Sequence, residues 1–201
     1  FIFDVNTPEK LRAMDGQVFL DEDDDVYCVW RGEFDKDAME KLMKSISPKV
    51  GDVFLVPAKT VHAIGAGCLI LEVQEPTDFT IQPERWCGDY KLSDDEMYLG
   101  ISPDDAVKCF GFGEQPSAKV EPKTVYEEKG VTVECLIDRT LTPCFVINRI
   151  KCDGGSYPMN VKDSYAVYIV TAGEGEMIGE DYRHSLCQGD YFFLPYASMG
   201  Q

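Results

Sequence analysis

Hydrophobic and polar positions alternate in short runs along this chain, with frequent turn residues between them. Over 35–43 the apolar positions follow a helical period behind an aspartate, which predicts a short amphipathic helix with its apolar stripe in the core. A second short helix is expected over 102–110, where Ser102 can cap the N-terminus and Pro103 occupies the first helical position. Later runs predict short strands over 131–137, 144–151, 166–171, 175–178 and 191–194. The pattern predicts a mainly β protein with a few short helices.

A polar segment with two prolines, 114–122, predicts a linker. It divides the chain into a first domain over 1–113 and a second over 123–201. Residues 50–82 of the first domain alternate strands and turns. Many short strands with turn signals between them are typical of β-sandwiches and β-barrels.

One sequence unit occurs in both predicted domains. Residues 50–62 and 188–200 share Gly-Asp, an aromatic residue two positions after the Asp, an aliphatic residue and a proline. Gly-Asp predicts a tight turn into a strand, and the proline ends that strand because it lacks a ladder donor. The first copy finishes with His62 and the second with Gly200. We therefore expect chemistry in the first copy and a structural role for the second.

His62 is the first candidate for a functional residue. It follows the predicted strand directly, and in a small β-barrel this is a position at the mouth, where side chains converge on a ligand-sized interior. An imidazole there can bind a metal, and a hydrogen-bonded structural histidine is the alternative. Downstream, a glycine-rich turn leads into a predicted apolar strand on which Glu72 and Gln74, with Asp78 beyond, alternate onto one face. The pattern predicts carboxylate and amide groups near the imidazole.

The segments Gly-Asp-Val-Phe-Leu-Val-Pro at 51–57, Thr-Val-His-Ala-Ile-Gly at 60–65, Leu-Glu-Val-Gln at 71–74 and Thr77-Asp78 together closely resemble type I mannose-6-phosphate isomerases. The resemblance covers 35–112 strongly and 123–201 more weakly. It implies a double cupin of two jelly-roll β-barrels, with a metal site in the first barrel and none in the second. It also implies that mannose 6-phosphate and fructose 6-phosphate are interconverted through a zinc-assisted enediol.

The family's zinc (Zn2+) site, as the resemblance implies it, takes a Gln and a His from a Gln-x-His segment, a Glu from a Lys-Thr-Glu segment, and the His of Thr-Val-His-Ala. His62 supplies the last of these, and residues 1–34 contain neither of the other two segments. Gln17-Val18-Phe19 is a near miss that we interpret as a coincidence. Two explanations are open: the sequence begins partway through the first barrel, or the metal site has been lost. The start at Phe1 and the stop at Gln201 favour the first.

The resemblance also suggests roles for four polar residues. Glu72 and Asp78 are candidates for acid/base or hydroxyl-positioning roles, because a buried carboxylate beside a cation can exchange protons near neutral pH. The alternatives are an orienting contact to His62 for Glu72 and a turn at the strand end for Asp78. The family's arginine, four residues after the aspartate, is replaced by Gln82. Arg85 could restore that positive charge, or form a surface ion pair instead.

Charge and composition limit the classes of binding partner expected for this protein. A formal net charge of -17 would repel phosphates, which argues against nucleic acid. No apolar run reaches membrane-spanning length and no signal pattern is present, so we expect no membrane partner and a cytoplasmic protein. A hexose phosphate substrate would need local positive charge, for which Arg85, Lys91 and Lys59 are candidates. Lys59 replaces the family's usual glycine and is interpreted as a surface loop residue.

Two acidic clusters, 21–25 and 94–96, are interpreted as solvated loops. The eight cysteines contain no Cys-x-x-Cys pair and have mostly apolar neighbours, which predicts reduced core thiols rather than a disulfide framework. The oligomeric state is left open.

A non-catalytic sugar-binding cupin is the alternative function. The missing ligands and Gln82 favour it, whereas His62, Glu72 and Asp78 favour the isomerase. A cupin metalloenzyme of another reaction type ranks last, because such sites usually need a His-x-His pair that this sequence lacks.

Overall fold

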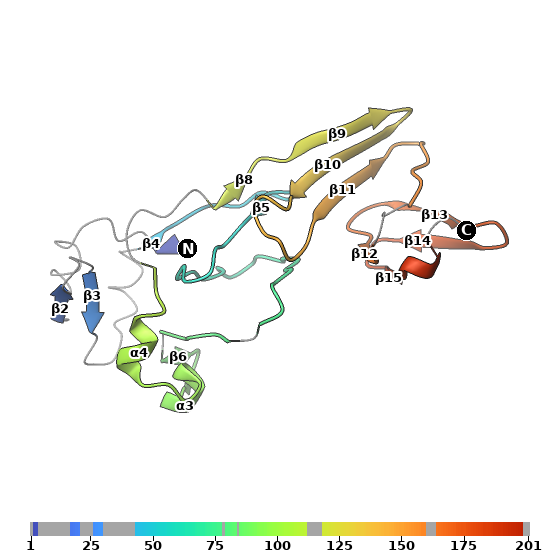
Figure 1. Ribbon diagram of the computed structural model, residues 1–201. Helices are drawn as coiled ribbons and strands as arrows, with labels where there is room; N and C mark the ends of the chain where they lie inside the picture. The colour runs from blue at the N-terminus through green and yellow to red at the C-terminus, as the bar shows by residue number, and fades with distance from the viewer. Residues whose placement is uncertain are drawn as a thin grey trace. The chain divides into compact units, whose positions relative to one another are not determined.

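The computed structural model describes residues 2–3, 17–20, 26–29, 43–77, 79–83, 85–111, 118–159 and 164–198 (Figure 1). Its elements in chain order are β1 (Ile2–Phe3), β2 (Gln17–Leu20), β3 (Val26–Val29), β4 (Met43–Lys44), β5 (Val53–Phe54), β6 (Trp86–Cys87), β7 (Tyr90–Lys91), α3 (Asp94–Tyr98), α4 (Pro103–Val107), β8 (Lys119–Val120), β9 (Lys123–Glu128), β10 (Val131–Ile137), β11 (Ile147–Cys152), β12 (Ala166–Ile169), β13 (Glu174–Ile178), β14 (Arg183–Cys187), β15 (Tyr191–Leu194) and the 3-10 helix η1 (Tyr196–Ser198). The mainly β fold class is confirmed. Neither helix in these ranges has the length and apolar character needed to cross a membrane.

The chain forms two compact units. The first comprises Phe1–Val125 and Glu134–Arg149, and the second comprises Tyr126–Val133 and Ile150–Gln201. Within the predicted linker, the two residues of β8 pair antiparallel with β5, with Val120 opposite Val53. The segment Glu134–Arg149, which the sequence suggested for the second domain, lies in the first unit. Residues from beyond the predicted linker therefore contribute to the unit that contains His62.

Strand β10 has the bounds that the hydrophobic pattern predicted. Its side chains alternate, with Val131, Val133 and Ile137 buried and Thr132 only partly so. A pleated strand with one face on a core requires this period of two. The alternation in the sequence therefore indicated both the strand and its buried face.

Strand β9 was not predicted, because all six of its residues are exposed and their sequence shows no apolar alternation. It is the neighbour of β10 in the three-stranded sheet β11-β10-β9 (Figure 1). The connecting residues Lys129 and Gly130 have φ angles of 49° and 74°. A type I′ hairpin turn needs positive φ at both central positions. The tight turn, rather than burial of side chains on β9, therefore determines that β9 pairs with β10.

Helix α4 confirms the helix expected from its capping residues. The Ser102 hydroxyl accepts the Asp105 backbone N–H at 3.2 Å, and Pro103 occupies the first helical turn. The helix is shorter than the predicted range of 102–110, because Lys108 is already its C-cap. Ala106 is its buried residue among those described.

Helix α3 corrects the prediction of a solvated loop over 94–96. The Ser93 hydroxyl accepts the Glu96 N–H at 3.3 Å, and the Glu96 carboxylate accepts the Ser93 N–H at 2.8 Å, which is a capping box. The acidic residues lie in the first turn, where the helix dipole favours negative charge. The capping signature Ser-x-x-Glu is present in the sequence at 93–96. The helix shows no apolar periodicity, because Met97 is its one buried side chain.

The second unit contains two antiparallel strand pairs, β12 with β15 and β13 with β14. Strands β12 and β15 fall in predicted ranges, β13 begins one residue before its predicted range of 175–178, and β14 was not predicted. Tyr168 of β12 lies opposite Phe192 of β15 on the half-buried face, with ring centroids 5.2 Å apart. Val167 and Phe193 form the next pair and are exposed on the other face.

One prediction from the hydrophobic pattern is wrong, and a second falls almost wholly outside the described residues. The strand expected after the glycine-rich turn is wrong, because residues 68–75 have no strand structure and Leu69, Leu71 and Val73 are exposed. No described strand pairs with this segment, so its apolar side chains lack the neighbour that would cover them. Residues 35–42 of the predicted helix lie outside the described residues, and Met43 is the first residue of β4.

Seven cysteines are free among those whose side chains the structure describes. The prediction that they are core thiols is wrong for most of them: Cys68, Cys87, Cys144, Cys152 and Cys187 are exposed. Cys109 and Cys135 are partly buried. Apolar neighbours in sequence did not indicate burial, because strand neighbours point to opposite faces.

Candidate functional site

The first Gly-Asp turn leads into β5 and begins the candidate site. Gly51 has a φ of 89°, in the left-handed region that glycine adopts without a steric cost. The Asp52 N–H donates to the Lys49 carbonyl at 3.0 Å, and the Asp52 carboxylate accepts the Lys49 N–H at 3.0 Å. The backbone and the side chain of one aspartate thus close the turn.

Two cations from later in the chain hold this turn. Lys119 Nζ lies 3.0 Å from the Asp52 carboxylate. Arg149 of β11 donates from Nη1 to the Gly51 carbonyl at 2.7 Å, and its Nε pairs with Glu134 at 2.7 Å. The Lys49 N–H, followed by the Lys119 ammonium, lowers the pKa of Asp52. Charged side chains of β8 and β11 therefore position the turn that precedes His62.

His62 lies beyond Pro57, after a turn in which the Thr60 N–H donates to the Pro57 carbonyl at 3.2 Å. The imidazole is exposed, and its Nδ1 lies 2.9 Å from the Thr60 carbonyl oxygen. Because a carbonyl can only accept, this contact puts the proton on Nδ1 and leaves the Nε2 lone pair for another partner. Metal-binding histidines are commonly held in this way through the other ring nitrogen. His62 is thus hydrogen-bonded at one nitrogen and fits a ligand position at the other.

Lys59 occupies the turn between Pro57 and His62 with a φ of 71°. Its carbonyl accepts the Gly111 N–H at 2.7 Å, and its side chain is exposed. A side chain with a Cβ is strained in this conformation, whereas glycine is not. The backbone therefore suits the glycine that the family resemblance implies at this position, and the exposure agrees with a surface loop residue.

Glu72, one of the two carboxylates predicted to lie near His62, is in the segment that has no strand structure. Glu72 and Gln74 are exposed, and Asp78 lies outside the described residues. The alternation argument has no described sheet to support it, so the placement of Glu72 and Asp78 beside the imidazole stays a prediction. Glu75, between them in sequence, is anchored: its carboxylate accepts the Thr142 hydroxyl at 2.7 Å.

Gln82 and Arg85 are positioned by the region around α3. Gln82 is exposed, and its backbone N–H donates to the Met97 carbonyl at 2.9 Å. The Arg85 guanidinium pairs with Asp94 at 2.7 Å and donates to the Leu92 carbonyl at 3.1 Å. The ion pair considered for Arg85 is therefore present, and a sugar phosphate would have to compete with Asp94 for this cation.

Across the described ranges, no group of three or more His, Cys, Asp or Glu side chains is arranged to hold a metal ion. Zinc in proteins usually has three or four such ligands. His62 fits one position of that kind, and the described residues do not complete the set.

The second Gly-Asp turn, before β15, has the geometry of the first. Gly189 has a φ of 97°, the Asp190 N–H donates to the Cys187 carbonyl at 3.0 Å, and the Asp190 carboxylate accepts the Cys187 N–H at 2.7 Å. A separate hydrogen bond from the Cys187 thiol to the Asp190 carboxylate raises the pKa of that thiol. The Gly-Asp turn of the sequence repeat is therefore repeated in the structure.

The histidine of the second unit is in a different place. His184 lies within β14, opposite Met177 of β13, and its ring stacks on Tyr182 with centroids 6.2 Å apart. It precedes the Gly189-Asp190 turn, whereas His62 follows the first turn. Gly200, the counterpart of His62, lies outside the described residues. His184 is therefore not the structural equivalent of His62.

Sequence reasoning missed Arg149, Glu134 and Thr142, which hold the candidate site in place. Arg149 and Thr142 act on partners 98 and 67 positions earlier in the chain. The one available signal was a charged residue, Arg149, inside the predicted apolar strand over 144–151. Local pattern carries no information about contacts over such separations.

The comparisons with known proteins agree with the motif resemblance. Over 167 residues the chain is 34% identical to the mannose-6-phosphate isomerase ManA of Bacillus subtilis (strain 168), which covers 83% of this chain and 48% of that protein. Over 157 residues it is 27% identical to the mannose-6-phosphate isomerase of Streptococcus mutans serotype c, which covers 78% of this chain and 46% of that protein.

The chain spans about half the length of these curated relatives. No family model matches it, and no solved structure matches it. The match to ManA nevertheless extends over most of this chain, far beyond the segment around His62. On this evidence, the chain is a homologue of the mannose-6-phosphate isomerases over most of its own length.

Proposed function

We propose that the protein containing this chain is an aldose–ketose isomerase that interconverts mannose 6-phosphate and fructose 6-phosphate in the cytoplasm. The observation that carries the proposal is the 34% identity to a mannose-6-phosphate isomerase over 83% of the chain. The state of His62 supports it, because Nδ1 is held by the Thr60 carbonyl and Nε2 is left for a ligand.

In this proposal His62 is one of the ligands of a zinc ion, and the remaining ligands lie outside the described residues. A bound zinc ion would supply a Lewis acid for the sugar oxygens. The turn from 49 to 52 is held by Lys119 and Arg149, so the strand and loop that lead to His62 begin from a fixed point. Such fixation matters because metal ligands must be held close to the productive geometry.

The proton transfer is assigned to the carboxylates of Glu72 and Asp78. One of them takes the proton from C2 of the open-chain aldose, which gives an enediol, and a proton is then delivered to C1 to give the ketose. The hydroxyl proton lost at O2 balances the proton gained at O1. The other carboxylate orients the sugar hydroxyls.

Binding of the anionic sugar requires a local cation, because the chain has a net charge of -17. Arg85 is the candidate, with Gln82 donating a hydrogen bond from its amide. Arg85 would exchange part of its pairing with Asp94 for the phosphate or for a sugar hydroxyl. The fold proposed to surround this site is a double cupin, with the metal barrel first and a metal-free barrel over 123–201.

A non-catalytic sugar-binding cupin is the second candidate. It is favoured by the lack of a three-ligand metal cluster among the described residues and by the pairing of Arg85 with Asp94. This protein would bind a hexose phosphate without converting it.

An assay of the purified protein with mannose 6-phosphate separates the two candidates. Formation of fructose 6-phosphate, measured through a coupled dehydrogenase and lost after treatment with a chelator, is the expected result. Saturable binding of mannose 6-phosphate by calorimetry, with no product, would replace the isomerase by the binding protein. The 201-residue chain alone is expected to retain less than one equivalent of zinc after dialysis against a mild chelator, because one imidazole does not complete a site.

A further inference from the structure

Thr142 is a buried polar residue with 4% of its surface exposed, in the loop between β10 and β11. Its hydroxyl oxygen accepts the Cys144 N–H at 3.2 Å and lies 2.7 Å from the Glu75 carboxylate. A carboxylate can only accept, so the hydroxyl proton must point to Glu75. The result is a charge-assisted hydrogen bond, which is shorter and stronger than a neutral one.

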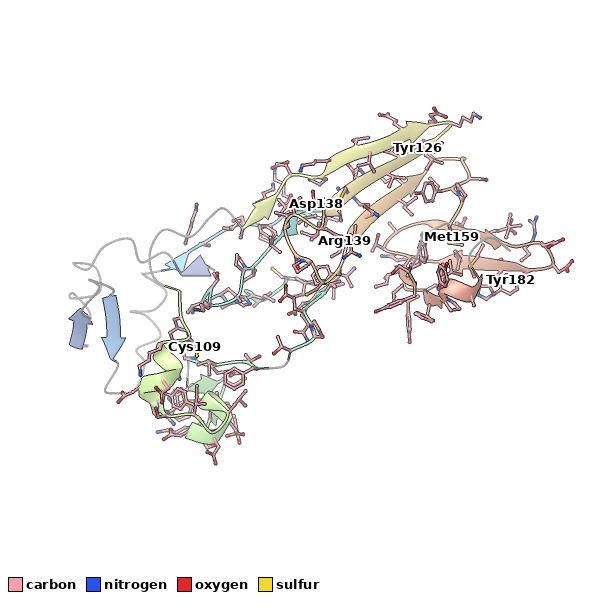
Figure 2. All side chains as sticks on the ribbon, viewed as in Figure 1. Cys109, Tyr126, Asp138, Arg139, Met159 and Tyr182 are labelled. Atoms are coloured by element: carbon pink, nitrogen blue, oxygen red, sulfur yellow. The ribbon has the colours of Figure 1, made fainter. Side chains whose placement is uncertain are left out.

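The loop that presents Thr142 is itself fixed. The Asp138 carbonyl accepts the Thr142 N–H at 3.3 Å, and the Asp138 carboxylate accepts both the N–H and the hydroxyl of Thr140. Arg139 Nη1 donates to the Pro143 carbonyl at 2.9 Å. Asp138 and Arg139 begin this loop directly after β10 (Figure 2). Thr142 is therefore a rigid donor rather than a mobile side chain.

Glu75, which accepts the Thr142 hydroxyl, connects this loop to the segment that follows His62. It lies midway in sequence between Glu72 and Asp78, in a segment that has no strand structure and exposes apolar side chains. The Thr77 N–H donates to the Glu75 carbonyl at 2.7 Å, so the residue before Asp78 is tied to Glu75 as well. A hydrogen bond from Thr142, 67 positions later in the chain, thus fixes the segment three residues after the proposed acid/base residue Glu72.

We propose that Thr142, acting through Glu75, is a positioning residue that fixes where Glu72 stands relative to the sugar. The inference rests on the proposed isomerase function for its catalytic consequence. Proton transfer depends steeply on distance and alignment, whereas binding of the sugar phosphate depends mainly on other groups. Loss of the hydroxyl should therefore lower kcat much more than it changes KM.

The kinetic test uses three variants of the full protein. Thr142→Val keeps the shape of the side chain and removes the donor, and we expect kcat to fall by about tenfold or more with KM within about threefold. Thr142→Ser retains the hydroxyl and should restore kcat to within about threefold of the parent protein. Thr140→Val is the matched control, because it removes one hydroxyl of the same loop while the N–H groups of Thr140 and Thr142 keep their hydrogen bonds to Asp138.

Hydrogen–deuterium exchange measured by mass spectrometry is the second readout, and it does not depend on activity. Thr142→Val should raise the exchange of peptides covering 71–77 and leave those of β9 unchanged, whereas Thr140→Val should leave 71–77 unchanged. A parent protein without isomerase activity would overturn the proposed function, and the exchange result would then decide the positioning role by itself. Unchanged exchange over 71–77 in Thr142→Val, or a kcat equal to that of the parent, would overturn the inference.

Discussion

The two Gly-Asp turns have the same backbone geometry and different surroundings. In both, a glycine with positive φ precedes an aspartate whose backbone and side chain bind the residue three positions earlier. At the first turn the aspartate also meets Lys119, and Arg149 binds the glycine carbonyl. At the second, the aspartate meets the thiol of Cys187. The same local sequence thus gives the same turn, and distant residues differentiate the two.

This difference indicates that the first turn is held more firmly in place than the second. The first turn leads to His62, whose Nε2 is left for a ligand, and charged side chains of β8 and β11 hold it. The second turn leads through β15 into η1, and the histidine of its unit stacks on Tyr182 within a hairpin. Long-range ion pairs add stiffness where the proposed chemistry needs it, and the four predictions below test this comparison.

The largest expected effect separates the two histidines. In an active protein, His62→Ala should remove bound metal and lower isomerase activity by about a hundredfold or more, because a ligand to the proposed zinc is lost. His184→Ala should leave turnover within a few-fold of the parent. Metal analysis and a coupled assay measure both. Loss of activity in a folded His184 variant would show that the chemistry belongs to the second copy.

The next comparison sets the support of the first turn against a surface ion pair. Arg149 and Glu134 have 26% and 15% of their side chains exposed, whereas Arg183 and Glu176 have 64% and 43% exposed. Arg149→Ala removes this pair and the bond to Gly51, and should lower the free energy of unfolding by about 1–3 kcal/mol. Arg183→Ala should cost about 0–1 kcal/mol. Urea denaturation followed by circular dichroism measures both, and equal losses would contradict a special role for Arg149.

Structural features could be predicted from the sequence where they depend on residues close together in the chain. The Ser102 cap, the alternation of β10 and the two Gly-Asp turns each depend on residues within a few positions, and all four are observed. The strand expected over 68–75 failed because a strand needs a partner, and none is described for it. The Arg149 and Thr142 contacts were missed for the same reason: they depend on residues far away in the chain.

A smaller effect is expected at equivalent positions in the turns that follow the two prolines. Lys59 has a φ of 71°, whereas its counterpart Ala197 lies in η1. A left-handed backbone destabilises a residue that has a Cβ by about 1–2 kcal/mol, and a glycine avoids this strain. Glycine also loses more backbone entropy on folding than other residues, which offsets about 0.5–1 kcal/mol of the relief. Lys59→Gly should therefore raise the free energy of unfolding by about 0.5–1 kcal/mol, and Ala197→Gly should lower it by about 0.5–1 kcal/mol. Thermal unfolding measures the signs, and destabilisation by Lys59→Gly would contradict the strain at this turn.

The smallest expected effect is a pH dependence that belongs to the first turn. The Lys49 N–H and then the Lys119 ammonium hold the pKa of Asp52 below its ordinary value of 3.8. Since the folded protein prefers the charged carboxylate, this group contributes stability above the ordinary pKa, and the contribution is lost as the pH falls through the lowered value. Asp52→Asn should therefore reduce the melting temperature at pH 6 by a few degrees and have a smaller effect at a pH below the lowered pKa of Asp52, where the carboxyl is protonated in both states. Lys119→Met should give part of this loss, because the Lys49 N–H, the larger cause, remains. Melting curves from pH 2 to pH 7 measure the profile. An Asp52→Asn effect that is the same at every pH would mean that the carboxylate charge does not stabilise the turn.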